Sequence, residues 1–196
     1  WDAVVGVVAE AMGEAYSVDI GGPKLASLDA LAFDGASKRN APDLGPGAVV
    51  FARVVRAGPG IEPELSCQTA STAGGAKKDW TTGQSTYGEL VGGVVFPASR
   101  AQCRRLAAPQ APLLESLGAV FPYEAAVGLN GRVWVSANEP EHVVLVGTAL
   151  RVTQGTDPDD AAAAALVKRL CRVAGISTNR AAGGRGAGEG TGADAD

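Results

Sequence analysis

The 196-residue chain has few of the side chains from which metal centres are built. It contains one histidine, His142, and three cysteines, none of which forms a C-x-x-C pair. A structural zinc site needs about four ligands at close spacing, so we expect no metal and no cofactor. The odd number of widely spaced cysteines also argues against a disulfide framework and favours a reducing compartment.

Long apolar runs are missing as well. The longest candidate, residues 143–150, is far shorter than the roughly 18 residues that a membrane-spanning helix needs. The sequence shows no signal peptide and begins at Trp1 without a methionine. We therefore expect no membrane segment, and the start at Trp1 is compatible with a processed or truncated segment without deciding between truncation and the natural start.

Positive charge and aromatic rings, with which many proteins grip single-stranded nucleic acid, are both scarce. The chain has 17 basic and 21 acidic residues, a net charge of −4, and 5% aromatic residues. The net charge is −4 over residues 1–70, +1 over 71–155 and −1 over 156–196. A free-standing nucleic-acid binder usually has a clear basic excess in some segment. We therefore expect the isolated chain to bind RNA weakly.

Short strands dominate the first third of the chain. Apolar and β-branched runs alternate there with turn-forming glycine and proline, at residues 4–8, 16–20, 49–55 and 65–68. Several short strands within about 70 residues predict a small closed barrel over residues 1–70. The Gly-, Ser-, Thr- and Lys-rich residues 71–85 are then predicted to form a linker.

The pattern changes to mixed strands and helices after this linker. A short strand at 92–96 and Asn130-Gly131 between two apolar runs predict a strand and a hairpin. Helical spacing is found at residues 97–106, 113–117, 139–154 and beyond Asp157, which we interpret as an N-cap. Residues 86–174 are thus predicted to form an α/β domain, and residues 175–196 a disordered tail.

Several motifs, taken in order, resemble one known family. They are VVGVV at 4–8, VDIGG at 18–22, ASL at 26–28, FDGASKRN at 33–40, EPEL at 62–65 and GLNGRVWV at 128–135. Together they closely resemble the S1/KH cap subunits of the eukaryotic RNA exosome, of the ribosomal RNA-processing protein 40 type. The resemblance extends from about residue 2 to residue 171. It implies a multi-domain β plus α/β fold, in which an S1 (OB-type) five-stranded β-barrel precedes a KH-type α/β domain.

The resemblance also implies a role in RNA handling without catalysis. Such cap subunits sit on a ring of RNase-PH-like subunits beside other cap subunits, and help to form the RNA entrance of the central channel. The complex carries out 3'-5' RNA processing and degradation, including ribosomal RNA maturation, in the nucleus, nucleolus and cytoplasm. The family has an N-terminal domain before S1, whereas this sequence begins where S1 begins, so docking surfaces on that domain fall outside it.

The loop Lys38-Arg39-Asn40 is the main candidate for RNA contact. Adjacent cations on an exposed barrel loop can contact phosphates, and OB-type barrels bind oligonucleotides with their loops and one sheet face. Two alternatives stay open, namely contact with a neighbouring subunit and a loop that is simply solvated.

Three further residues of the barrel are candidates for the same RNA path. Arg53 and Arg56 lie on the expected fourth strand and could extend the positive track, although structural ion pairs explain them equally well. Tyr16, at the start of a strand, is the one aromatic residue of the barrel that is a candidate for stacking on a base, and the two phenylalanines are expected to lie in the core.

The motif Gly128-x-Asn130-Gly131 has a different interpretation. In RNA-binding KH domains a GxxG loop lies between two helices and clamps the nucleotide backbone. Here the motif lies between two strands, which favours a tight turn, and in the resembling family it is associated with packing of KH against S1. We predict a structural turn at the domain interface, with direct RNA contact as the alternative, and we predict Trp134 to be an interface or core anchor.

No catalytic signature is found in the sequence. His142 lacks a nucleophile–base pattern and is expected to lie on an exposed helix surface. Arg100, Arg104 and Arg105 have helical spacing, and either form a solvated face or contact RNA or an acidic partner. We expect a non-enzymatic subunit; the alternative is an autonomous single-stranded RNA-binding adaptor outside the exosome, which should bind RNA tightly alone.

Overall fold

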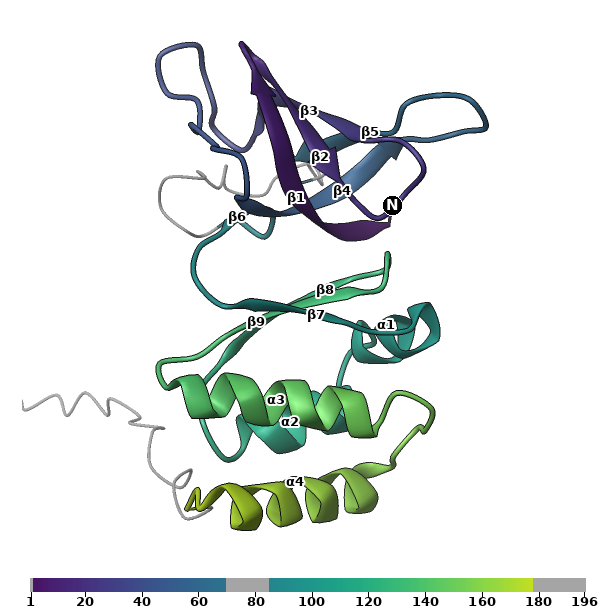
Figure 1. The fold of residues 1–196 in the computed structure, drawn as a ribbon, viewed down its shortest axis with the longest axis vertical. Coiled ribbons are helices and arrows are strands. Elements are labelled where there is room, and N and C mark those ends of the chain that lie inside the picture. Colours follow the sequence, from purple (N-terminus) through teal and green to yellow (C-terminus); the bar gives the residue numbers. More distant parts are fainter. Residues whose placement is uncertain (1, 70–84, 178–196) are drawn as a thin grey trace, which may run out of the picture.

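The computed structural model describes residues 2–69 and 85–177 (Figure 1). A β-barrel lies at one end of the molecule, a three-stranded sheet lies beneath it, and helices form the layers at the other end. Most of the predicted linker (71–84) and most of the predicted tail (178–196) lie outside the described residues. No helix in the described part of the chain is both long and apolar enough to cross a membrane.

The barrel is built from five strands, the number that the resemblance implied, although the apolar pattern of the sequence indicates only four of them and misses residues 26–33. They are β1 (Ala3–Met12), β2 (Ala15–Asp19), β3 (Ala26–Phe33), β4 (Val49–Arg56) and β5 (Glu64–Cys67). Neighbours follow the order β1-β2-β3-β5-β4, and pairing of β1 with β4 closes the barrel. The β3–β5 pair is parallel and the other pairs are antiparallel. Alternate side chains point inward, and they form a core that includes Val18, Leu28, Phe33 and Val50.

A sixth strand joins the barrel sheet from the first residues of the predicted second domain. Strand β6 (Gly88–Leu90) pairs antiparallel with β4 and so belongs to the barrel sheet and not to the α/β domain. The short β5 pairs with β4 only from Arg53 onward, so the first half of that edge of β4 is open for another strand. Such an open edge offers unpaired backbone groups, and β6 pairs with them. Tyr87 supports this pairing, with its ring centroid 5.2 Å from that of Phe51.

The second domain is a three-stranded sheet covered by helices. Its strands are β7 (Val94–Pro97), β8 (Glu124–Gly128) and β9 (Arg132–Ser136), in the order β7-β9-β8. The helices are α1 (Arg100–Leu106), α2 (Pro112–Gly118), α3 (Pro140–Val152) and α4 (Asp160–Ala174). They lie on the face of the sheet that points away from the barrel, so the sheet itself lies between the barrel and the helices (Figure 1).

The start of α4 differs from the prediction by two residues. Asp159, and not Asp157, is its N-cap, and its carboxylate accepts a hydrogen bond from the Ala162 N–H at 2.8 Å. Asp157 lies 3.4 Å from the Nε of Arg105 instead. Both aspartates suit an N-cap by residue type, and only Asp159 makes the capping hydrogen bond. Arg105 is half-buried, whereas Arg100 and Arg104 of the same predicted positive edge are exposed.

Candidate domain interface and RNA-facing residues

Asn130, at the tip of the β8–β9 hairpin, joins the two domains. Its Oδ1 accepts a hydrogen bond from the Val5 N–H at 3.1 Å, and its Nδ2 donates to the Val5 carbonyl at 2.8 Å. The same Nδ2 donates to the Ile20 carbonyl at 2.9 Å. Beside it, the Leu129 N–H donates to the Ala3 carbonyl at 2.8 Å. The carboxamide therefore pairs with β1 as a neighbouring peptide group would, and the hairpin tip is fastened to the barrel.

The two glycines of the motif are required by this arrangement. A Cβ at Gly128 would overlap the Asn130 side chain and would lie 2.5 Å from the Val5 nitrogen. Gly131 has φ = 87°, a left-handed conformation that glycine adopts without strain, whereas Asn130 does not have a positive φ. The motif is thus a tight turn pressed against β1. The structure places it at the domain interface, and the part of β1 beside it is covered by protein.

Arg132 forms a second link between the domains. Its Nη1 donates to the Asp19 carbonyl at 2.6 Å, and its Nη2 forms an ion pair with the Asp19 carboxylate at 2.8 Å. The hydrogen bond from Arg132, and then that from the Gly21 N–H, lower the pKa of Asp19 below its ordinary value. Our sequence reasoning missed this pair, although both residues lie inside quoted motifs. Opposite charges in two otherwise apolar motifs are the signal that could have suggested it.

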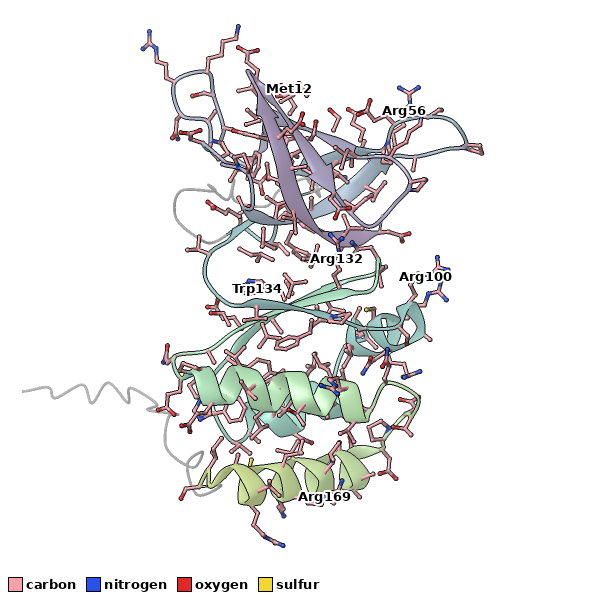
Figure 2. All side chains as sticks on the ribbon, viewed as in Figure 1. Met12, Arg56, Arg100, Arg132, Trp134 and Arg169 are labelled. Atoms are coloured by element: carbon pink, nitrogen blue, oxygen red, sulfur yellow. The ribbon has the colours of Figure 1, made fainter. Side chains whose placement is uncertain are left out.

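Trp134 fills the space between the sheet and the barrel. It is 4% exposed and packs with Val5 and Ala126, while its indole Nε1 donates to the Gly92 carbonyl at 2.8 Å. Val133 and Val135, on either side of it in β9, belong to the core under the helices. Because side chains alternate along a strand, β9 is buried on both faces. Figure 2 shows Arg132 and Trp134 between the two domains.

Lys38 and Arg39 lie at the tip of an exposed turn. Ser37 and Asn40 exchange backbone hydrogen bonds of 3.2 and 2.9 Å, which leaves the two cations at the turn between them. All four residues are exposed. Within the described part of the chain, no ion pair involves Lys38 or Arg39. Their exposure is compatible with contact to RNA or to another subunit, and the RNA contact stays a prediction.

The structure does not gather the other predicted cations around this turn. Arg53 is half-buried, and its Nε donates to the Gln68 carbonyl at 2.7 Å. Arg56 is exposed at the end of β4 (Figure 2). The loop that carries Lys38 and Arg39 precedes β4, and it lies on the opposite side of the barrel from Arg56 (Figure 1). A continuous positive track on the barrel would therefore have to cross the length of β4.

Tyr16 requires a correction. It is 5% exposed, it belongs to the barrel core, and its hydroxyl donates to the Pro42 carbonyl. A buried tyrosine commonly satisfies its hydroxyl in this way. The predicted stacking of Tyr16 on an RNA base is wrong for this structure, because the ring is covered by protein.

His142 also differs from its prediction, because it is not on an open surface. Its side chain is 14% exposed, its ring stacks on Phe121 with centroids 4.2 Å apart, and its Nε2 lies 3.4 Å from the Glu139 carboxylate. Packing against the ring of Phe121 accounts for its burial. Among the described residues, no three His, Cys, Asp or Glu side chains are grouped as a metal site.

Comparisons with known proteins agree with this arrangement of domains. Residues 1–78 match the family model of the exosome complex component RRP40 S1 domain, and residues 93–141 match a KH domain model. A crystal structure described as a "putative exosome complex RNA-binding protein" shares the fold, with a TM-score of 0.64 and 20% identity. The likeness covers 87% of this chain and 92% of that one.

Three curated relatives of the chain are all named exosome complex component RRP40. The chain is 40% identical over 151 residues to exosome complex component rrp40 of Schizosaccharomyces pombe, which covers 76% of this chain and 59% of the relative. It is 39% identical over 149 residues to RRP40 of Drosophila melanogaster (76% and 60%). It is 31% identical over 158 residues to RRP40 of Homo sapiens (81% and 54%). The chain thus spans between half and two thirds of the length of these relatives. By its S1 and KH domains and by these relatives, the chain belongs to the RRP40 family of exosome complex components.

Proposed function

We propose that the chain acts as a non-catalytic, RNA-binding cap subunit of the RNA exosome. In this role it helps to form the RNA entrance to the central channel for 3'-5' processing and degradation, including ribosomal RNA maturation. Its partners are the RNase-PH-like ring subunits, the other cap subunits and single-stranded RNA. The names of the relatives and the two matched domains support this assignment. By the same reasoning the subunit works in the nucleus and nucleolus and in the cytoplasm.

The observation that carries the proposal is the bonded contact between the domains. Asn130 and Arg132 make five hydrogen bonds to the barrel, two from Arg132 and three from Asn130, and Trp134 is buried beside them. A strand that must enter a narrow opening needs contacts held at fixed positions. A two-domain unit with such a contact can supply them without any chemistry of its own.

Within this function the exposed barrel turn is the proposed RNA contact. Lys38 and Arg39 offer adjacent charges for phosphates, and Asn40 can bond to a phosphate or a sugar. Arg56 offers a further charge on the other side of the barrel. A surface of this kind holds RNA through few charges, so its affinity in isolation is low and its position in the assembly determines its effect.

Reconstitution tests the proposal. The full chain is mixed with purified ring subunits and passed over a sizing column, and its binding of a labelled polyuridylate is measured alone and in the complex. We expect stable co-elution, weak binding by the chain alone and stronger binding by the complex. Tight, salt-sensitive RNA binding by a chain that does not co-elute would instead establish the autonomous adaptor. Metal-dependent cleavage of the RNA by the purified chain would contradict a non-catalytic role.

A further inference from the structure

Several positive charges lie on the outer side of α4, although residues 156–196 have a net charge of −1. Lys168, Arg169 and Arg172 are exposed, and we call them the α4 cationic face. The opposite side of the helix is buried through Ala163, Val167 and Cys171. Figure 2 shows Arg169 pointing away from the body of the molecule, at the end opposite the barrel.

Helical geometry places the three cations on one side. At about 100° per residue, Lys168, Arg172 and Arg169 fall within an arc of about 100°, and Lys168 and Arg172 lie one turn apart. The only acidic residue of α4, Asp160, precedes Lys168 by about 12 Å along the helix axis. Among the described residues, no acidic side chain forms an ion pair with any of the three. Three unneutralised positive charges therefore face the solvent together.

The stability of the helix does not account for this face. A cation in the last turn is favoured by the partial negative charge of the helix C-terminus, but the effect falls off within that turn. Arg172 is the basic residue of the last turn. Lys168 and Arg169 precede it and have no such explanation, and an external anion is the natural partner for the set.

The neighbours on the face indicate which kind of anion. The other exposed residues within the same arc are Ala161 and Ala165, and the exposed large apolar side chain of α4, Val173, lies about 40° beyond Arg169 at the edge of the face. Protein partners usually bind through buried aromatic or apolar anchors with arginine beside them. A phosphate backbone needs positive charge alone and gives no sequence preference. A face with three cations, a single valine at its edge and no aromatic side chain therefore favours nucleic acid over an acidic protein.

We propose that the α4 cationic face contacts the phosphate backbone of single-stranded RNA, without sequence preference. This inference rests on the proposed function, because it gives RNA a second contact on the same subunit. The contact lies on the KH domain, at the opposite end of the molecule from the barrel turn of Lys38 and Arg39. The two surfaces hold different stretches of one strand, and the domain interface holds them at a constant separation.

The salt dependence of RNA binding tests the inference. A fluorescein-labelled polyuridylate is titrated with the full chain, and the slope of log affinity against log salt measures the phosphates that are neutralised. Each phosphate on a single strand contributes about 0.7 to the slope. The variant K168Q/R169Q/R172Q should therefore lower the slope by about 2. The single variant R169Q should lower it by about 0.7, and it carries the test if the triple variant does not fold.

A matched control removes the same charge from residues outside every candidate RNA surface. The double variant K24Q/R151Q replaces two exposed cations and should keep most of the wild-type slope, whereas the double variant K168Q/R169Q should lower it by about 1.4. An equal fall in both variants would mean that net charge alone matters, and it would overturn the inference. An unchanged slope in the α4 variant would also overturn it. Polyguanylate and polyadenylate should show the same loss as polyuridylate, since phosphate contacts ignore the base.

Two further measurements separate the other outcomes. If labelled polyglutamate binds the wild-type chain and loses binding in the α4 variant while polyuridylate does not, the face serves an acidic protein and the inference is wrong. The α4 variant should co-elute with ring subunits as the wild type does. Failure of the wild type to co-elute would overturn the proposed function, whereas an unchanged slope in a chain that co-elutes would overturn only the inference on α4.

Discussion

At the scale of single residues, Asn130 and Asn40 show that the same type of side chain has different roles at different positions in the fold. Both are asparagines in turns. The Asn130 carboxamide makes three hydrogen bonds to backbone groups of the barrel. Asn40 is exposed and contributes its backbone to a turn. Only a partner far away in the sequence distinguishes them.

Asn130→Ala should destabilise the folded chain. The substitution leaves the Val5 N–H and the carbonyls of Val5 and Ile20 without this partner, and each unsatisfied buried group costs about 1–3 kcal/mol. Because all three bonds are only part-buried, water replaces some of them, and we expect a loss of about 2–4 kcal/mol in the free energy of unfolding, measured by urea titration. Asn40→Ala is the control and should change it by less than about 0.5 kcal/mol. Equal losses in the two variants would show that the interface bonds contribute nothing.

The Asp19–Arg132 pair should make stability depend on pH. The pKa of Asp19 is lowered in the folded chain, so the pair stabilises it above the ordinary pKa of an aspartate. That contribution is lost as the pH falls through the lowered pKa. In urea titrations, wild type should be more stable than Asp19→Asn at neutral pH, and the difference should vanish in acid. In an Arg132→Gln background the difference at neutral pH should be smaller, and an unaltered difference there would contradict the assignment.

At the scale of elements, strand β9 joins the two domain cores. Val133 and Val135 contribute to the core under the helices, and Trp134 contributes to the cluster against the barrel. The connection from β6 to β7 passes over the indole, and the Gly92 carbonyl accepts its N–H. A strand buried on both faces has no freedom to shift its register, because a shift would exchange its two sets of side chains.

Gly92 and Gly93 in that connection provide a matched pair of substitutions. Their φ angles are 72° and 73°, so alanine is strained equally at both, by about 1–2 kcal/mol. A Cβ at Gly92 meets nothing within 4 Å. A Cβ at Gly93 overlaps the Val135 carbonyl and lies 2.9 Å from the Trp134 ring.

Gly93→Ala should therefore destabilise the chain more than Gly92→Ala. The additional loss should be roughly 1–3 kcal/mol, the usual cost of overpacking. Urea unfolding followed by tryptophan fluorescence measures both variants. Equal losses would mean that only the backbone angle matters and that the indole is free to move.

At the scale of the whole molecule, the interface decides whether the two domains act as one body. Hydrogen bonds from the hairpin, the Asp19–Arg132 ion pair and the Trp134 cluster all lie between the barrel and the sheet. They use backbone groups of β1 and the end of β2, which are parts of the barrel frame and not mobile loops. An RNA contact on the barrel and one on α4 can then stay at a constant separation.

The wild-type chain should tumble as a single body in solution. Backbone amide relaxation should give one rotational correlation time for residues of the barrel and of the helical domain. The variant N130A/R132A should give two different times, and its radius of gyration by small-angle scattering should rise. The control K38A/R39A should behave as the wild type. Two different times in the wild type would contradict a rigid unit and would weaken the proposed role in guiding RNA.

Features that depend on neighbours in the chain were accessible from sequence alone. Apolar and β-branched runs indicated four of the five barrel strands, with β3 missed, and Asn130-Gly131 between two apolar runs indicated the β8–β9 hairpin. These signals are local, because strand alternation and turn chemistry need only a few consecutive residues. The order of motifs indicated the family, and the comparisons confirmed it.

Other features were decided only when distant segments came together. The burial of Tyr16, the pairing of β6 with β4 and the link from Asp19 to Arg132 each depend on contacts between residues far apart in the chain. The charge on α4 was also not visible from the sequence, because residues 156–196 have a net charge close to zero although three cations lie on one side of the helix. The net charge of a segment is a sum along the chain, whereas binding depends on how the charges are distributed over the surface of the folded protein. The sequence by itself determined most of the elements and the family, while packing decided which residues are covered and which remain exposed to a partner.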